Sequence, residues 1–517
     1  MEHSDTQTHS PSKLSPNAHQ KPLFTSLQHT IDTIQQTVGY SDDVMVRQLF
    51  IGESTKQSLA IVYIDGLVNK ADITNTLLEP IMGLLTDQIE ENIEKTTDFL
   101  KQYCLTIGNV QEIQKFATLY SALFNGSAII IVDGLATALA TNIKDPKDRP
   151  VMEPATESVI RGPRESFTET LRTNTALIRR KIKNPNLWVQ SKIIGDVTQT
   201  DVAIIHINGI ANDKIVQEVF DRLNQIDIDG ILEGGYIESL IQDAQFSLFP
   251  TMYTSERPDV IAGELLEGKV AIMVDGTPFV LIVPSLITSF LQSSEDYYSN
   301  AIVSSLIRLL RFVAILISLV APAFYVAITT FHHEMLPTPL LISIASQREG
   351  VPFPAVIEAL LMELAFEILR EAGLRMPRTI GPAVSIVGTL VIGEAAVTAG
   401  VVSAVTVIIV ALTAICSFIF PSYGLSNSIR VLRFPFILLA GGFGLYGVMI
   451  GMLALVLHLC SLRSFGIPYM SPFAPLILEN QKDAILLLPR RFLKKRPRLV
   501  NQTNMTRESK YKKRYKR

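Results

Sequence analysis

Cysteine and charge are both scarce in this chain, and each shortage excludes a class of protein. The 517 residues include three cysteines, Cys104, Cys416 and Cys460, which form no CxxC pair and supply no disulfide framework. Charged residues make up 18%, whereas hydrophobic residues make up 48% and the mean hydropathy is +0.29. This is too apolar for an ordinary soluble protein, and the apolar residues are clustered, so we expect a membrane protein.

The signatures of common enzyme sites are also missing. The sequence contains no P-loop, no glycine pattern of a dinucleotide-binding fold, no HExxH and no GxSxG. The eight histidines are scattered apart from His332-His333-Glu334. We interpret this cluster as a polar cap on a membrane span rather than a metal site. We therefore expect no enzyme activity, no catalytic residue, no cofactor and no bound metal.

The N-terminus lacks a targeting signal. Its first 22 residues are polar and contain three prolines, a composition typical of disordered chain. No apolar segment follows a basic start, so no signal peptide is predicted. We expect a disordered N-terminal extension and a cytoplasmic N-terminal half.

Four apolar runs in the N-terminal half end in Asp-Gly or Asn-Gly, at Asp65, Asp133, Asn208 and Asp275. Asp65 and Asn208 are 143 residues apart, and Asp133 and Asp275 are 142 apart. Constant spacing across a whole unit indicates duplication, and each run predicts a buried strand. The sequence therefore predicts two α/β subdomains. We interpret the Asx-Gly pairs as strand-ending turns rather than as ligands of a metal or substrate.

A basic linker joins the two predicted subdomains. Ser166 and Glu169 fit a capping box, which predicts a helix that runs to about Ile182. Its arginines could bind phosphate or an acidic partner, although we favour a solvated helix or one that forms salt bridges between the subdomains. The candidate linker or interface residues are Arg161, Arg164, Arg172, Arg179 and Arg180.

The C-terminal half has the pattern of a helical membrane domain. Residues 312–331 include no charged residue. A helix of this length can cross about 30 Å of hydrocarbon. A cytoplasmic N-terminal region and a basic C-terminus require an even number of spans, and we predict four. In this arrangement Arg430 and Arg433 lie outside, which counts against it under the positive-inside rule. The third span could instead be two short helices that turn near Gly400. The predicted spans are 307–331, 354–371, 384–418 and 435–461.

The C-terminal tail is polybasic, with 13 Lys or Arg and one Glu over residues 490–517. Nucleic-acid-binding segments share this charge, but the tail directly follows an apolar segment. We therefore expect a cytoplasmic, largely unfolded anchor on anionic lipid and no nucleic-acid partner.

The predicted organisation is an α/β region followed by a membrane α region. In chain order the units are a disordered extension (1–40), α/β subdomain 1 (41–150), a linker helix (151–190), α/β subdomain 2 (191–285), a connecting or interfacial helix (286–305), the transmembrane domain (306–465), a post-membrane segment (466–489) and the basic tail (490–517).

Charged residues inside the membrane half are candidate functional residues, because ionisable groups in spans are costly unless they face protein or water. A ring of carboxylates in an oligomer would select cations. The alternative is that Glu363 and Glu367 pair with arginines and that Glu394 is protonated. The candidates are Glu358, Glu363, Glu367, Arg370 and Glu394.

Several long blocks resemble a known family. They include "RGPRESFTETLRTNTALIRRKIKNPNL" (161–187), "LFPTMYTSERPDVIAGELLEGKVAIMVDGTPFVLIVP" (248–284), "SEDYY" (294–298) and "EILREAGLRMPRTIGPAVSIVGTLVIGEAAVTAGVVS" (367–403). The chain is similar over about residues 40–490 to the A-subunit family of GerA-type spore germinant receptors. It departs at Ala404, where relatives often have proline.

The resemblance implies a multi-pass protein of the spore inner membrane with both termini in the spore core. It implies a permease-like B subunit, a lipoprotein C subunit and membrane lipids as partners. It also implies nutrient-triggered germination through a homo-oligomeric, pentamer-like cation channel. The alternative is a paralogue associated with the dipicolinate-release apparatus. A solute transporter is less favoured, because four spans are few for a carrier acting alone. Which nutrient is sensed, and by which subunit, is left open by the sequence.

Overall fold

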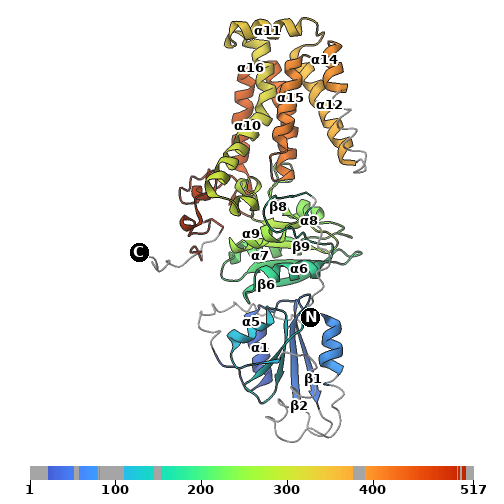
Figure 1. Ribbon diagram of the computed structural model, residues 1–517, viewed down its shortest axis with the longest axis vertical. Helices are drawn as coiled ribbons and strands as arrows, with labels where there is room; N and C mark the ends of the chain where they lie inside the picture. The colour runs from blue at the N-terminus through green and yellow to red at the C-terminus, as the bar shows by residue number, and fades with distance from the viewer. Residues whose placement is uncertain are drawn as a thin grey trace, which may run out of the picture.

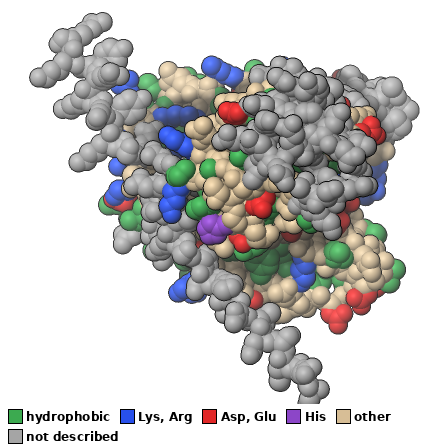
Figure 2. Space-filling view, turned by 90° about the horizontal axis from the view of Figure 1, so that it is seen from below, with side chains coloured by type: hydrophobic (Ala, Val, Ile, Leu, Met, Phe, Trp, Pro, Cys, Tyr) green, Lys and Arg blue, Asp and Glu red, His purple; other side chains and the backbone are tan. Residues whose placement is uncertain are grey.

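Two α/β units and a bundle of apolar helices follow one another along the chain (Figure 1). The computed structural model describes residues 21–51, 57–79, 81, 110–144, 153–154, 156–375, 391–497, 499–500 and 504–507. Seen from below, the end formed by the first unit carries Lys and Arg as well as Asp and Glu side chains (Figure 2). We call the end of the helical bundle beside the α/β units the near end, and the opposite one the far end.

The first α/β unit is a five-stranded antiparallel sheet of order β1-β2-β4-β5-β3. Alternate residues of β2 face opposite layers, as the strand period requires. Ala60 and Val62 pack against α1 and α5, whereas Leu59 and Ile61 pack against η2. Its elements are α1 (Leu27–Thr37), β1 (Val44–Ile51), β2 (Gln57–Ile64), α2 (Lys70–Asp72), the π-helical η2 (Ile73–Leu78), β3 (Val110–Ile113), α5 (Phe116–Leu123), β4 (Ser127–Val132) and β5 (Ala138–Asn142).

The second unit has the corresponding strand order, β6-β7-β9-β10-β8. Helices α6 and α9 lie on one face of its sheet, and α7 and α8 on the other. Its elements are α6 (Leu171–Lys181), β6 (Leu187–Ile194), β7 (Thr200–Ile207), α7 (Asp213–Asn224), α8 (Gly234–Ile241), β8 (Tyr253–Ser255), α9 (Pro258–Leu266), β9 (Val270–Val274) and β10 (Val280–Val283).

Each unit begins earlier than predicted, because a helix precedes its first strand. Residues 27–37, expected to be disordered, form α1, and its Ile31 and Ile34 lie in the first core. Residues 1–20 lie outside the described part of the chain. Helix α6, expected to be a linker, packs into the second unit. The Ser166–Glu169 capping box is wrong: α6 begins at Leu171, and the Ser166 hydroxyl donates to the Glu256 carbonyl instead.

Two of the Asp-Gly pairs hold the first helix of their own unit. Asp133, after β4, accepts a hydrogen bond from the Leu27 N–H at the start of α1 at 2.9 Å. Asp275, after β9, accepts one from the Leu171 N–H at the start of α6 at 2.9 Å. A carboxylate beside free helix N–H groups is favourable. These pairs therefore tie a sheet to a helix rather than bind a ligand.

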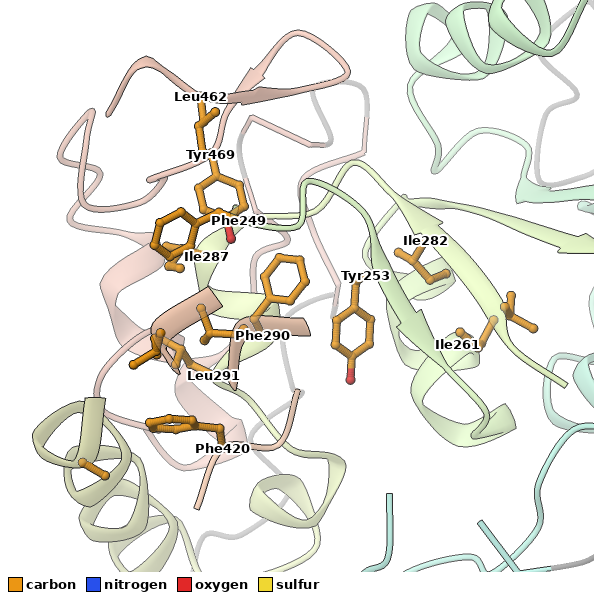
Figure 3. Packing of buried hydrophobic residues seen from close by; sticks show 14 of the residues in the cluster. Phe249, Tyr253, Ile261, Ile282, Ile287, Phe290, Leu291, Phe420, Leu462 and Tyr469 are labelled. Atoms are coloured by element: carbon orange, nitrogen blue, oxygen red, sulfur yellow. The ribbon is translucent and has the colours of Figure 1, made fainter. Parts of the chain in front are cut away.

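A continuous apolar core joins the second unit to the membrane helices. Figure 3 shows Phe249, Phe290 and Tyr469, from three separate segments, packed together. The Phe290 ring lies 5.6 Å from Tyr253 and 6.0 Å from Tyr469, measured between centroids. The second unit and the bundle are therefore held together by packing as well as by the chain.

The segment between the second unit and the bundle is not the helix expected over 286–305. It consists of two 3-10 turns, and the first long helix begins at Ala301. The elements that follow the second unit are η4 (Ile287–Phe290), η5 (Ser294–Tyr297), α10 (Ala301–Phe331), η6 (His333–Met335), α11 (Thr338–Arg348), α12 (Ala355–Arg375), η7 (Val391–Ala395), α14 (Ala396–Thr398), α15 (Ala404–Ser417), α16 (Tyr423–Ser461), β11 (Arg463–Ser464), β12 (Ile467–Pro468), η8 (Asn480–Asp483) and η9 (Arg490–Phe492).

Helix α16 turns back on itself at Gly444, where φ is 61° and ψ is −144°. A straight helix of 39 residues would be about 58 Å long. Instead, both ends of α16 reach one loop of the second unit: Ser428 donates to the Leu248 carbonyl, and the His458 Nε2 lies 3.0 Å from the Ser247 hydroxyl. Helix α16 is therefore a hairpin of two antiparallel arms.

Two of the four predicted spans differ from the structure. The span 435–461 is divided by the turn at Gly444, and its first arm begins at Tyr423. The span 384–418 is interrupted at Gly400, which has a φ of 68°, so its described part is two short helices. By length and composition, α10 and α16 of the described residues could cross a membrane, and α15 is apolar but shorter.

The beginning of the basic tail is folded, contrary to the prediction. Arg496 is 8% exposed and donates to the Leu266 carbonyl at the end of α9. Val500 is buried in the core of the second unit, and Arg507 pairs with Glu267. The described part of the tail, which includes Arg496, Val500 and Arg507, therefore docks on the second α/β unit. Residues 498, 501–503 and 508–517 lie outside the described residues.

Candidate functional site

Helix α12 carries two carboxylates on its buried face. Its buried side chains are Ala355, Glu358, Ala359, Met362 and Glu363, the i, i+3, i+4 spacing of one helix face. Glu358 is 0% exposed and Glu363 is 3% exposed. A buried carboxylate needs a partner, and the surrounding helices provide one for each.

Glu363 of α12 belongs to a polar network that includes side chains of three other helices. Its carboxylate lies 2.6 Å from an Arg433 guanidinium nitrogen on α16, and the Thr413 hydroxyl on α15 is 3.4 Å away. Arg433 also donates to the backbone carbonyl and the hydroxyl of Ser318 on α10, each at 2.8 Å. This network fixes the four helices relative to one another.

Glu367 lies one turn further along α12 and is more open. Its side chain is 35% exposed and pairs with Arg370 at 2.5 Å and with Arg430 at 3.4 Å. Arg430 and Arg433 are three residues apart on α16, and Glu363 and Glu367 are four apart on α12. The two arginines thus face the two carboxylates in reverse chain order, as expected for antiparallel helices.

Glu358 lies nearer the far end. It accepts a hydrogen bond from the Ser403 N–H at the start of α15, and its other oxygen is 3.7 Å from Arg348 on α11. The Tyr325 hydroxyl lies 3.3 Å from both the Ser403 and the Thr406 hydroxyls. The far end is therefore a polar junction between α10, α11, α12 and α15.

Glu394 differs from the other candidates because it is exposed in the single chain. It lies on η7, six residues before the bend at Gly400, which packs against Gly350 at the far end. Within the described residues no ion pair to Glu394 is present. Of the five intramembrane candidates, it is the one that is exposed, whereas the other four are buried or half-buried.

A second buried network joins the bundle to the segment before it. Asp296, 3% exposed, pairs with Arg308 at 3.0 Å and with Arg311 at 2.6 Å, both on α10. Arg308 also pairs with Asp483 at 2.9 Å, and burial raises the pKa of that carboxyl above its ordinary value. This network was not predicted from the sequence. The available signal was the pair Arg308 and Arg311, three residues apart near the start of the apolar helix α10, which follows the acidic "SEDYY" (294–298).

Of the linker arginines, Arg179 has a defined structural role. It is 0% exposed and forms a bidentate ion pair with Asp43 of the first unit, with N–O distances of 2.7 and 2.8 Å. It thereby links the two units, as the favoured interpretation predicted for this residue. The other four are exposed, and Arg164 pairs with Glu153 at 3.2 Å.

The buried charged side chains of the bundle connect structural elements to one another. Among the described residues, no group of three or more His, Cys, Asp and Glu side chains could hold a metal. The charged side chains instead join helix to helix and helix to α/β unit. Breaking such buried pairs is costly, so they favour discrete arrangements of the bundle.

The model of the family described as "Bacillus/Clostridium GerA spore germination protein" matches residues 32–499. Spore germination protein KA of Bacillus subtilis (strain 168) is 51% identical over 94% of this chain and 88% of its own length. Spore germination protein B1 of the same organism is 40% identical over 92% of this chain and 97% of its own. Spore germination protein GerLA of Bacillus cereus is 38% identical over 93% and 97%.

One solved structure is also similar. It is the crystal structure of the N-terminal domain of the A subunit of the Bacillus megaterium spore germinant receptor GerK3. It is 40% identical, covers 52% of this chain and 98% of that chain, and has a TM-score of 0.41.

Proposed function

Since this chain belongs to the GerA family of spore germination proteins, we propose that it is the A subunit of a nutrient germinant receptor and forms the cation-conducting channel of that receptor. The channel is a homo-oligomer, pentamer-like, in the spore inner membrane. A permease-like B subunit and a lipoprotein C subunit assemble with it.

The packing of the C-terminal segment supports a multi-pass topology with both ends on one side. Ser464, just after α16, donates to the Thr251 carbonyl of the second α/β unit, and Arg496 docks on the end of α9. The segments before α10 and after α16 therefore lie on the same side, which requires an even number of crossings. We propose that this side is the spore core.

The exposed carboxylate of Glu394 is the observation that carries the channel proposal. A charge that faces the middle of the bilayer is costly, by at least about 2.5 kcal/mol, so we expect Glu394 to face water or another subunit. Glu358, Glu363 and Glu367 are already paired within the chain, so they are not free to attract cations in this arrangement. A ring of Glu394 side chains, one per subunit, would supply the negative charge of a cation-selective mouth at the far end.

The α/β units transmit the nutrient signal to this mouth. We infer that they arose by duplication, because the strand orders match and both first helices are capped by an Asp that follows the fourth strand of its unit. The ion pairs of Asp296 with Arg308 and Arg311 join η5 to α10. The Tyr298 hydroxyl, directly after η5, donates to Asp259 on α9 of the second unit, so a rotation of that unit would reach the bundle through this segment.

The test uses spores that lack their own copy of the chain and carry it with or without Glu394→Gln. The proposal predicts nutrient-dependent release of monovalent cations with the parent chain and strongly reduced release with the variant, at equal protein abundance. Equal cation release by both chains would contradict the channel mouth. Nutrient-induced cation release that proceeds in the complete absence of the chain would contradict the receptor role.

A further inference from the structure

The loop between α8 and β8 exposes large apolar side chains beside the membrane helices. Phe246 is 101% exposed and Leu248 is 48% exposed. Figure 1 places α8 at the edge of the second unit that faces the helical bundle. Residues 244–250, "AQFSLFP", carry no charge, and the preceding Asp243 is neutralised by Arg222 at 2.7 Å.

This loop is fixed to both arms of the α16 hairpin. Ser428 of the first arm donates to the Leu248 carbonyl, and Gly424 packs against Pro250. On the second arm, His458 lies 3.0 Å from the Ser247 hydroxyl. The exposed side chains therefore occupy a defined position relative to the membrane helices.

The depth of this position follows from the hairpin. His458 is 14 residues after the turn at Gly444, which is about 21 Å along the arm. The hydrocarbon of a bilayer is about 30 Å thick. With Gly444 at one surface, His458 and the loop beside it lie at the level of the opposite leaflet.

The surface around the loop matches that leaflet in chemistry. Leu453 and Leu457 on the neighbouring arm are each 62% exposed, so the apolar surface of the span continues to the loop. A groove of about 440 Å³ beside Phe246 is lined by Gln242, Asp243, Ala244, Gln245, Ser247 and His458. Its amide, hydroxyl and imidazole groups can hydrogen-bond the ester and phosphate region of a lipid, while an aromatic ring at this level is typical of a membrane interface.

We propose that residues 245–248 insert into the bilayer leaflet on the side of the α/β units, with Phe246 and Leu248 at the boundary between headgroups and acyl chains. Because the same loop is packed against both arms of α16, this insertion anchors the second α/β unit at a fixed height below the bundle. The inference concerns lipid contact alone and holds whether or not the chain conducts ions.

The test is fluorescence quenching by lipids with brominated acyl chains, in vesicles that contain the full chain. The chain has one tryptophan, Trp188, in β6. The fluorescence of the parent protein therefore gives the background that is subtracted from each variant. Phe246→Trp adds a reporter in the loop. Phe50→Trp adds the matched control, since Phe50 is 66% exposed on β1 of the first unit, far from the bundle (Figure 1).

The proposal predicts that the added emission of Phe246→Trp is largely quenched, and more strongly by bromine near the headgroup than by bromine near the chain end. The added emission of Phe50→Trp stays unchanged. Absence of quenching for Phe246→Trp overturns the proposal, since the loop then lies outside the bilayer. Equal quenching of both reporters also overturns it, since contact would then not be specific to the loop.

Discussion

Arg433 of α16 and Glu363 of α12 form an ion pair of 2.6 Å in which neither side chain is more than 3% exposed. Glu363→Gln leaves the Arg433 charge buried without its anion. Removal of one partner of a buried pair costs about 3–5 kcal/mol. We therefore expect a large fall in the thermal unfolding temperature of the purified protein.

The matched control for this variant is on the same helix. Glu371 and Arg375 pair at 2.7 Å, but their side chains are 50% and 80% exposed, and such pairs contribute at most about 1 kcal/mol. Glu371→Gln should therefore unfold like the parent. A similar loss of stability for both variants would show that burial of the Glu363 pair has no special effect.

The contact between α10 and η5, the segment that follows the second unit, depends on Asp296. Asp296→Asn leaves Arg308 and Arg311 without the carboxylate they share, so the connection should loosen. We expect spores with this variant to need more nutrient for the same rate of cation release, at an abundance that quantitative blotting finds unchanged. The neighbouring Glu295→Gln is the control, because Glu295 forms no ion pair within the described residues. A nutrient response to Asp296→Asn that equals the response to Glu295→Gln would argue against this coupling.

Gly39 is where the first unit packs against Trp188 of the second. A Cβ at Gly39 would lie 2.1 Å from the indole ring, and the φ of this glycine is 63°. Gly209 has a φ of 77° but nothing within 4 Å of a Cβ. Gly209→Ala therefore has only the backbone cost of about 1–2 kcal/mol, whereas Gly39→Ala adds about 1–3 kcal/mol for the clash. Urea unfolding should rank Gly39→Ala as clearly the less stable, and an equal stability of the two variants would contradict the packing.

Glu157 makes the stability of the second unit depend on pH. Burial, the largest cause, raises the pKa of its carboxyl to about 7, and the nearby Glu256 raises it further, although the Ser255 hydroxyl bonds to it. The pKa in the folded state is thus above that of the unfolded chain, about 4.5. The stabilising effect of the protonated form is complete below pH 4.5 and is lost as the pH rises through 7, by up to about 3 kcal/mol.

The variant Glu157→Gln should lose this dependence. Unfolding temperatures measured between pH 4.5 and 8 should fall for the parent more steeply than for the variant. Parallel curves would show that Glu157 titrates in the folded protein as it does in the unfolded chain.

Much of the fold could be predicted from local pattern. The buried strands before Asp65, Asp133, Asn208 and Asp275 are continuous apolar runs, and the membrane half is visible as long uncharged segments. The family resemblance is confirmed by the comparisons. The positions of helices α1 and α6 could not be predicted from local sequence. They are fixed by capping contacts with Asp133 and Asp275, which lie more than 100 residues away in the chain.

The partners of the candidate site residues were harder to predict. In the predicted topology Arg430 and Arg433 lie in an outside loop, which conflicts with the positive-inside rule. They lie within α16 and neutralise Glu367 and Glu363, a relationship that depends on how α12 and α16 pack. The turn at Gly444 was also missed, because "AGGFGLYG" fits close helix packing as well as a hairpin, and local sequence does not distinguish the two.

The most direct test of the channel is the flux of K⁺ through vesicles that contain the purified chain, with Glu394→Gln compared against the parent. Glu349→Gln is the control, because Glu349 is also exposed and lies close to Gly350 at the far end. We expect the parent and Glu349→Gln to conduct K⁺ in preference to Cl⁻. Glu394→Gln should lose most of the K⁺ flux and most of the preference for K⁺ over Cl⁻. If the parent conducts no cations, or if Glu394→Gln conducts them as the parent does, the proposal that Glu394 forms the mouth of a cation channel is wrong.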